Sequence, residues 1–461
     1  MDSLYVYTAS CRVLKYTMAF DMLSSMFGSV PQSHESALAL VKAATISNPT
    51  LLSLKDLIET DGAGAWPPRA THGETWPAPL RQYHDIYLAA APFLSTEDVS
   101  ADDEVNKSRV ESFRERVSSA LKEKVDLDAV KSILSATETN NGNEPSFPTA
   151  AYNGFASCIS NLRHAYRWGV IPVVRIAQEE KIISFPEELT LPWPFVSRRY
   201  GVTSQGGNLM TNYFCNFDQQ DRIVYQINPC LSESIRSAEY HFAFMLVRIE
   251  RLALPIYTEM TLATSHFNRG DKKACLASLK RINSLFPSPL KIFYKTLVDT
   301  TISPKVWMHY VQGPTGWGAG EMINGEYVEY DGLSGSHIPF FRIADAFLGI
   351  KAYFDLESRR KYIPEGQRVF CKKMRDDCIR EAAQENGDLE IVQVLEGIVK
   401  QLKTFRAAHR SRIHKYLSTP APERLIMTAG KSVLESEEIP EIETAIKHLD
   451  GILAKRISET K

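Results

Sequence analysis

The sequence lacks a surplus of charge of either sign. Its 53 lysines and arginines face 55 aspartates and glutamates, which gives a formal net charge of -2 at pH 7. Binding to nucleic acid depends on clustered lysine and arginine that neutralise phosphates. We therefore expect no nucleic-acid partner.

Long apolar runs are also missing. The most apolar window, YHFAFMLVRIERLALPIY at 240–257, contains two arginines and a glutamate, whose burial in lipid would be costly. The first residues, MDSLYVYTASCRVLKY, carry an acidic second residue and two basic residues, which is atypical of a cleaved secretory signal. We predict no membrane partner and a cytoplasmic location.

The sequence has few cysteines, and their spacing shows no pairing pattern. The seven cysteines are scattered among 461 residues and form no CxxC pair. Disulfide frameworks and zinc sites usually show clustered or regularly spaced cysteines, so this distribution suits a reducing compartment. The CxxCH motif of covalent heme attachment is absent as well.

What the sequence does contain is typical of a globular helical protein. Hydrophobic residues make up 44% of it and charged residues 23%. Apolar residues recur three and four positions apart over long segments, which indicates an all-α fold class. One amphipathic helix is predicted from Ser232 to Leu254, ending at Pro255 because proline disrupts the helical hydrogen bonds. Another is predicted over 388–417, while the proline-rich stretch 184–208 is expected to be a loop with short turns.

A glycine-rich segment at 313–341 precedes the apolar stretch FFRIADAFLGI. Glycine-rich backbone that leads into a helix can hold an anion through its free N–H groups. The segment lacks the closing Gly-Lys-Ser/Thr of a P-loop. A flexible connector is the alternative that the composition leaves open.

The helix predicted over 388–417 brings one histidine to its inward face. The apolar positions 391, 394, 395, 398, 402 and 405 form one stripe, and four further residues lead to His409. His414 lies about 140° around the helix from His409 and is expected on a solvated flank. An inward histidine alone is more often a core residue than a ligand. Arg406, however, lies on nearly the same face, and guanidinium groups bind carboxylates.

This pair suits a non-covalent heme site. A neutral imidazole can ligate iron, and a neighbouring arginine can bind a heme propionate. The same helix, LKTFRAAHRSRIHKYL, resembles the proximal-histidine helix of the indoleamine 2,3-dioxygenase and tryptophan dioxygenase heme superfamily, including its monodechloroaminopyrrolnitrin synthase branch. Five further stretches resemble segments of that superfamily and follow one another in the same order along the chain. From the N-terminus they are PLRQYHDIYLAAAPFL, LRHAYRWG, LTLPWPFVSRRY, VQGPTGWG and YVEYDGLSGSHIPFFRIADAFLGI.

The resemblance implies a fold and a division of the chain. It implies a large helical heme-binding domain at 229–461 and a smaller, mostly helical domain at 75–228 that caps the distal side of the heme. Residues 1–74 lie outside the resemblance and are interpreted as an N-terminal helical extension. The cofactor implied is heme b, with its iron on His409.

The resemblance also assigns site residues one position at a time. It gives Arg406 to a heme propionate and Ser334, Gly335 and Ser336 to the loop that closes over heme and substrate. The distal helix supplies catalytic candidates at Tyr240, His241 and Phe244. The remaining substrate-pocket candidates are Ser197, Tyr200 and His309.

One departure from the family concerns the substrate. Val311 stands where the family has an arginine that binds the substrate carboxylate. The implied activity is heme-dependent oxygenation of an indole or tryptophan-derived compound, with O2-dependent 2,3-dioxygenation of the indole ring as the reference reaction. Oxidative rearrangement, monooxygenation and a catalytically silent heme-binding homologue remain alternatives. The implied partners are an aromatic substrate and dioxygen, in a monomer or weak homo-oligomer.

Overall fold

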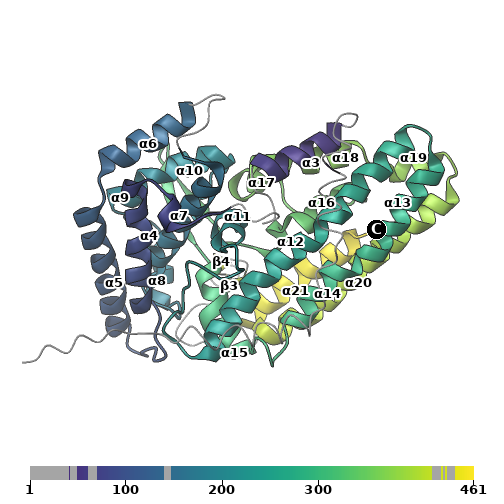
Figure 1. Cartoon of the computed structure of the whole chain (residues 1–461). Helices are drawn as coiled ribbons and strands as arrows, with labels where there is room; N and C mark the ends of the chain where they lie inside the picture. The colour runs from purple at the N-terminus through teal and green to yellow at the C-terminus, as the bar shows by residue number, and fades with distance from the viewer. Residues whose placement is uncertain are drawn as a thin grey trace, which may run out of the picture.

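The computed structural model describes residues 41, 49–60, 70–139, 147–417, 427–428, 431–432 and 442–461. Helices dominate these residues, and the described strands form only two small two-stranded sheets. The predicted all-α fold class is therefore confirmed. Figure 1 shows two groups of helices, one from the first half of the chain and one mainly from the second half.

The first group surrounds one buried helix, α7. Nearly every residue of α7 is buried, and the helix ends at Gly169, whose φ of 67° suits glycine. The helices and turns of this group are η4 (Gly73–Thr75), α4 (Ala78–Ala90), η5 (Ala91–Phe93), α5 (Asp103–Lys124), α6 (Leu127–Thr139), α7 (Thr149–Trp168), α8 (Arg175–Glu179), α9 (Glu187–Thr190), α10 (Pro192–Tyr200), α11 (Leu209–Asn212) and η6 (Phe214–Asn216).

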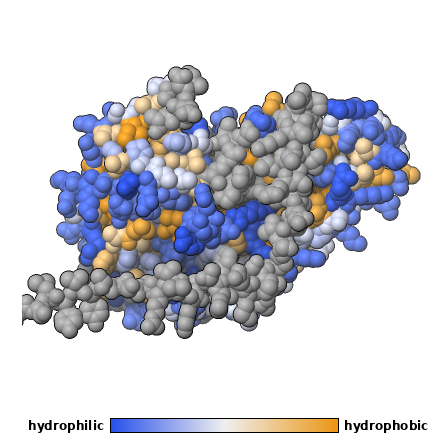
Figure 2. Space-filling model, viewed as in Figure 1, coloured by the Kyte–Doolittle hydropathy of each residue, from blue (hydrophilic) through white to orange (hydrophobic). Residues whose placement is uncertain are grey.

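The outer helix α5 shows how the sequence fixes this arrangement. Its buried apolar residues Val110, Phe113, Val117 and Leu121 recur at helical spacing, so a single stripe faces inward. Asp102 caps the helix by accepting a hydrogen bond from the backbone N–H of Glu104 at 3.0 Å. The opposite side faces solvent, and Figure 2 shows mainly hydrophilic residues over this edge of the molecule.

The second group is built around the long helix α12. Its elements are α12 (Glu233–Asn268), α13 (Lys272–Leu285), α14 (Pro287–Thr296), α15 (Pro304–Val306), the π-helical η7 (Trp307–Gln312), η8 (Gly313–Thr315), β1 (Ala319–Ile323), β2 (Glu326–Tyr330), η9 (Gly335–His337), α16 (Pro339–Phe347), α17 (Leu356–Tyr362), α18 (Glu365–Asp376), α19 (Arg380–Glu385), α20 (Leu389–Leu417), β3 (Met427–Thr428), β4 (Lys431–Ser432) and α21 (Ile442–Glu459). The predicted helix over 388–417 is confirmed as α20.

The N-terminal helix α3 (Pro49–Thr60) also lies on the second group, beside α18 (Figure 1). The hydroxyl of Thr50 donates a hydrogen bond to the Asp377 carboxylate at 2.6 Å. At least this part of the segment predicted as an extension is therefore helical and docked. The proposed boundaries after residues 74 and 228 stay predictions.

The prediction that a helix ends at Pro255 is wrong. Helix α12 continues through this proline to Asn268, and Leu254 and Ile256 on either side of it are fully buried. A proline inside a helix removes one hydrogen bond, but burial of apolar side chains against neighbouring helices can outweigh that loss. Here α13 and α14 supply the packing.

Two irregular stretches contain more structure than the sequence predicted. Helix α10 lies within 184–208, which was expected to be loop, because Trp193, Val196 and Tyr200 bury one face. The glycine-rich segment contains the β1–β2 hairpin, whose turn has positive φ at Asn324 and Gly325. An Asn-Gly pair is a strong hairpin signal, so this element was detectable in the sequence.

Among the described residues, no helix is both long and apolar enough to cross a bilayer.

Candidate functional site

His409 lies on the inward face of α20, as the helical phase predicts. Its ring centre is 5.0 Å from that of Phe293 and 6.0 Å from that of Phe405, which it overlies at 21°. Burial, with a smaller contribution from Arg406, lowers the pKa of the imidazole to about 4. Neither ring nitrogen makes a hydrogen bond within the described part of the chain. His409 is therefore neutral and has a nitrogen lone pair available.

Arg406 is held by a buried carboxylate. Its Nη2 donates to both oxygens of Asp345 at 2.8 and 2.9 Å, and its Nη1 donates to Thr460 Oγ1 at 2.6 Å. Arg456 from α21 also donates to Asp345. Asp345, Arg456 and Thr460 are each less than a tenth exposed. This network joins α16, α20 and α21 directly beside the turn that carries His409.

These residues fit a heme on the side of His409. A neutral imidazole with an unused nitrogen has the chemistry that an iron ligand requires. Arg406 retains N–H groups beyond those bonded to Asp345 and Thr460, and its orientation is fixed by them. The roles of Arg456 and Thr460 were not predictable from the sequence, because no local pattern links α21 to α20.

The three predicted catalytic residues of the distal helix lie together on α12. The rings of Tyr240 and Phe244 stack at 5.2 Å and 23°, and His241 lies edge-on to Tyr240 at 5.4 Å. Phe217 joins them from the first helix group, with its ring 5.6 Å from that of Phe244. Burial, assisted by the charge of Arg248, lowers the pKa of His241. This cluster is an apolar wall with one neutral imidazole beside it.

The predicted loop Ser334 to Ser336 forms the short helix η9 and the cap before it. Ser334 Oγ accepts a hydrogen bond from the backbone N–H of Ser336 at 3.2 Å, and the N–H of Ser334 donates to His337 Nδ1 at 3.2 Å. A Cβ atom added at Gly335 would meet no atom within 4 Å. The loop is thus fixed at its ends and has free space at Gly335.

The three predicted pocket residues occupy two separate places. Ser197 and Tyr200 lie on α10, where Tyr200 is buried and donates a hydrogen bond to Asn153 Oδ1 at 2.6 Å. His309 lies on the π-helical turn η7 and its ring is 6.3 Å from that of Tyr310. Short π-helical turns are frequent at functional sites.

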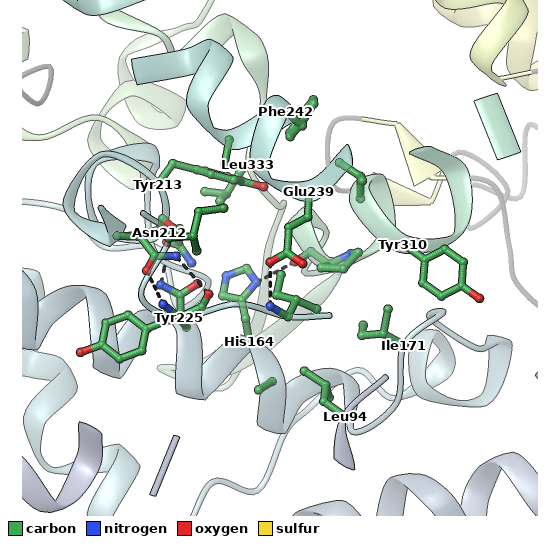
Figure 3. A pocket seen from close by; sticks show the side chains of 18 of the residues that line it. Leu94, His164, Ile171, Asn212, Tyr213, Tyr225, Glu239, Phe242, Tyr310 and Leu333 are labelled. Atoms are coloured by element: carbon green, nitrogen blue, oxygen red, sulfur yellow. Dashed lines mark hydrogen bonds between the residues drawn. The ribbon is translucent and has the colours of Figure 1, made fainter. Parts of the chain in front are cut away.

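A cavity of about 40 Å³ lies between the two helix groups (Figure 3). None of the predicted site residues lines it, but Val311 does. The lining comes from α7, the region of α11 and η6, α12, and the segment around η7 and η8. Its residues are Leu94, Asn161, His164, Ala165, Trp168, Ile171, Asn212, Tyr213, Asn216, Ile223, Tyr225, Ile227, Glu239, Phe242, Ala243, Tyr310, Val311, Pro314 and Leu333.

Helix α12 presents Glu239 to this cavity. The carboxylate accepts hydrogen bonds from the backbone N–H of Ile227 at 2.7 Å and from the backbone and side-chain N–H groups of Asn228 at 2.9 and 2.8 Å. Burial raises the pKa of Glu239, and these three hydrogen bonds oppose the rise. The described lining includes no lysine or arginine. The cavity therefore favours a positive charge over a negative one.

His164 closes the cavity from α7. Its Nδ1 lies 3.0 Å from the carbonyl oxygen of Pro314, and its Nε2 contacts the carbonyl oxygen of Gly206. Burial is the main cause that lowers the pKa of its imidazole. Both nitrogens face protein oxygens, so His164 ties α7 to η8 rather than offering a nitrogen to a ligand.

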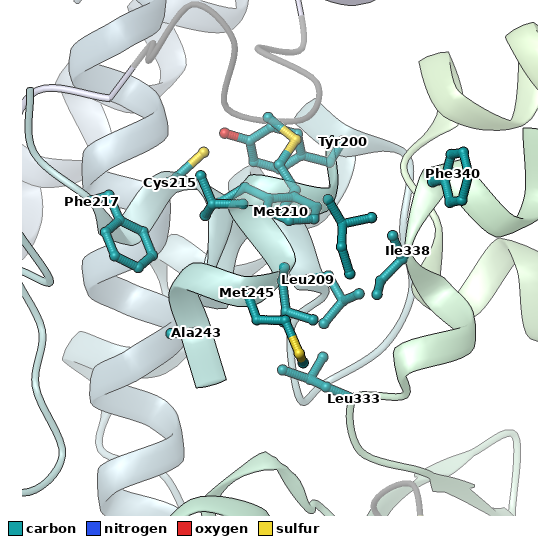
Figure 4. Close-up of a cluster of buried hydrophobic side chains, with 14 of the residues drawn as sticks. Tyr200, Leu209, Met210, Cys215, Phe217, Ala243, Met245, Leu333, Ile338 and Phe340 are labelled. Carbon is teal, nitrogen blue, oxygen red and sulfur yellow. The ribbon is translucent and has the colours of Figure 1, made fainter. Parts of the chain in front are cut away.

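An apolar cluster connects the cavity with the glycine-rich loop (Figure 4). Leu209 and Met210 of α11 and Met245 of α12 gather there with Leu333 and Ile338, which flank η9. All five are less than a tenth exposed. The loop is thus anchored against α12 at the contact between the two helix groups.

The family model described as Indoleamine 2,3-dioxygenase matches residues 155–447, which is more than half of the chain. The matched span contains α12, the loop around η9 and the α20 segment with His409.

Proposed function

This chain belongs to the indoleamine 2,3-dioxygenase family, and from that premise we propose that it is a heme-dependent oxygenase of an indole-type aromatic metabolite. The reference reaction is O2-dependent 2,3-dioxygenation of the indole ring. The observation that carries the proposal is His409, a half-buried neutral imidazole without a hydrogen-bond partner in the described residues, on the helix where the family has its iron ligand.

Each group of residues would have its own role in this activity. When heme is bound, its iron supplies the activation of dioxygen. His409 would hold the iron through its free ring nitrogen, and Arg406, oriented by Asp345, would bind a propionate. The loop formed by Ser334, Gly335 and Ser336 would cover the edge of the heme.

The distal residues would handle the aromatic substrate. The stacked rings of Tyr240 and Phe244 provide a wall against which an aromatic ring can pack. His241 beside them is a neutral polar group that can hold or accept a proton. Ser197, Tyr200 and His309 are proposed as outer walls of the substrate pocket.

A second candidate is monooxygenation or oxidative rearrangement of a tryptophan derivative. It is favoured by Val311, which is 5% exposed and lines the cavity where the family has a carboxylate-binding arginine. A branched hydrocarbon there leaves a free amino-acid carboxylate without a cation, so the substrate should carry a masked or missing carboxylate.

The iron assignment is tested with two variants on α20. His409→Ala should lose heme or its five-coordinate absorption spectrum, because the axial nitrogen is removed. His414→Ala, whose native side chain lies outside the described residues, should keep both. Equal heme binding by the two variants would remove the basis of the proposal.

The reaction class is tested by product mass. The reduced, heme-loaded protein is incubated in air with a panel of indoles, and the products are weighed by mass spectrometry. A gain of two oxygen atoms supports dioxygenation, whereas one oxygen or none supports the second candidate. Absence of turnover throughout the panel would instead indicate a catalytically silent heme-binding homologue.

A further inference from the structure

One histidine holds the loop of Ser334, Gly335 and Ser336 from its C-terminal side. The Nδ1 atom of His337 accepts a hydrogen bond from the backbone N–H of Ser334 at 3.2 Å, and the backbone N–H of His337 donates to the carbonyl oxygen of Ser334 at 2.9 Å. The side chain is buried, since His337 is only 4% exposed. The imidazole can therefore fix the loop only while its Nδ1 carries no proton.

Two aromatic rings enclose this imidazole. The ring of Tyr362 stacks on it at 5.1 Å and 19°, and the ring of Phe354 lies 4.7 Å away at 36°. The hydroxyl of Tyr362 also accepts a hydrogen bond from the backbone N–H of Asp331 at 2.6 Å. Tyr362 thus contacts the loop at both ends, through Asp331 before it and His337 after it.

The helix that carries Tyr362 is tied to the first helix group. The carbonyl oxygen of Lys361 in α17 accepts a hydrogen bond from the backbone N–H of Ser204 at 2.9 Å, and Arg368 of α18 donates to the carbonyl oxygen of Gly201 at 2.7 Å. Figure 1 shows α17 on the side of the second group that faces α10. Tyr362 therefore has a fixed support against which the loop can be held.

The groups packed around His337 include one buried cation. Arg342 of α16 donates to the carbonyl oxygen of His337 at 3.2 and 3.1 Å and to Gln367 of α18 at 2.6 Å. Helix α17 contributes the phenol of Tyr362, whose pKa is raised by burial and by the nearby carboxylate of Asp331. Burial and, to a smaller extent, Arg342 lower the pKa of His337 to about 3. An imidazolium here would also turn a second donor toward the N–H group of the loop, so that contact would be lost.

From these contacts we infer that His337 and Tyr362 form a latch that holds the loop over the proposed site and that opens when the imidazole takes up a proton. Both are positioning residues, because they act through the loop and not on heme or substrate. The inference rests on the proposed function for the role of the loop. In the open loop the imidazole reaches water, where its pKa returns toward 6.5. The latched loop is therefore favoured above about pH 6.5, and protons favour the open loop below it.

Backbone hydrogen–deuterium exchange of the full chain measures this opening. The peptide that contains residues 331–338 should be protected at about pH 7.5. After correction for the intrinsic exchange rate, it should lose about tenfold of its protection at about pH 5.5. His337→Asn should remove this pH dependence, since an amide oxygen can accept from the Ser334 N–H but does not titrate. His266→Asn, in the last turn of α12, is the matched control and should keep the tenfold difference.

Two further variants separate the contacts of the latch. Tyr362→Phe keeps the stacked ring and removes the acceptor of the Asp331 N–H, so exchange at Asp331 should rise at both pH values. His337→Phe keeps a ring between Phe354 and Tyr362 but cannot accept from the Ser334 N–H. Its loop should exchange about fivefold faster than the wild type at about pH 7.5, as expected for one lost hydrogen bond, and should not respond to pH.

Three results would overturn the inference. They are a wild-type loop whose corrected exchange is the same at both pH values, an equal pH dependence in the wild type and His337→Asn, and a wild-type exchange rate in His337→Phe. Hydrogen exchange requires neither turnover nor product, so these results are distinct from failure of the proposed function. That failure appears as a missing heme spectrum or missing oxygenated product.

Discussion

The surroundings of single side chains decide which residues of this chain can do chemistry. Helical phase was enough to predict that His409 faces inward, because a continuous apolar stripe precedes it. The partner of Arg406 was not predictable in this way, since Asp345 is 61 residues away and belongs to another helix. A carboxylate in an apolar sequence such as RIADAFLGI gives no local sign of which cation it meets.

Glu250 is, after Asp345, a second buried carboxylate, and its protonation should affect the stability of the protein. It accepts hydrogen bonds from the backbone N–H of Phe340 at 2.8 Å and from the hydroxyl of Tyr257 at 3.0 Å. Burial nevertheless raises its pKa from 4.5 to about 7. Between these values the Glu250 carboxyl group therefore binds more protons in the folded protein than in the unfolded chain. Its contribution to the free energy of unfolding should fall as the pH rises through this window, by about 3 kcal/mol at most.

The measurement for this prediction is urea unfolding at about pH 5 and about pH 8. Between the two pH values the wild type should lose up to about 3 kcal/mol of stability relative to Glu250→Gln, because an amide does not titrate. The exposed Glu385 provides the control, so Glu385→Gln should retain the wild-type difference. Identical pH dependence in the wild type and Glu250→Gln would contradict the assignment to this carboxyl group.

At the scale of helices and strands, the structure differs at two places from what local sequence signals predicted. Proline predicted the end of a helix at 255, yet α12 continues because Leu254 and Ile256 are buried. Glycine richness suggested a connector, yet the Asn324–Gly325 turn forms a hairpin. The sequence also did not show which face of α12 points to the cavity. Its cavity-lining residues are Glu239, Phe242 and Ala243, whereas Tyr240 and Phe244 lie on another flank.

The docking of α21 gives a prediction at this scale. Arg456 joins this helix to Asp345, and Thr460 just beyond it accepts a hydrogen bond from Arg406. Arg456→Ala should lower the free energy of unfolding by about 3 kcal/mol, the lower end for breaking a buried ion pair, because Arg406 still neutralises Asp345. Backbone amides of α21 should exchange faster with deuterium. Lys455→Ala removes an exposed neighbour and should change neither quantity, so equal effects of the two variants would refute the docking role.

At the scale of the whole molecule, the family match and the structure support one helical architecture. The cavity and the aromatic cluster of Tyr240, Phe244 and Phe217 lie where its two groups of helices meet. The sequence predicted the helical class from apolar periodicity, because that signal accumulates over many residues. The contacts between the groups were not predictable, since Asn228, for example, bonds to Tyr310 across 82 residues. Such contacts depend on the complete fold.

Because His409 and Arg406 belong to α20, heme binding should stabilise the second helix group in addition to supplying the cofactor of the proposed reaction. A ligand that binds only the folded state adds about 2.7 kcal/mol at a hundredfold excess over its dissociation constant. The heme-loaded protein should therefore unfold at a higher temperature than the same protein after heme extraction. His409→Ala should lose most of this increment while its heme-free form melts close to the heme-free wild type. Lys403→Ala, at an exposed position of α20, should keep the full increment. If heme raised the melting temperature of His409→Ala as much as that of Lys403→Ala, the porphyrin would have to bind elsewhere, and the axial role of His409 would fail.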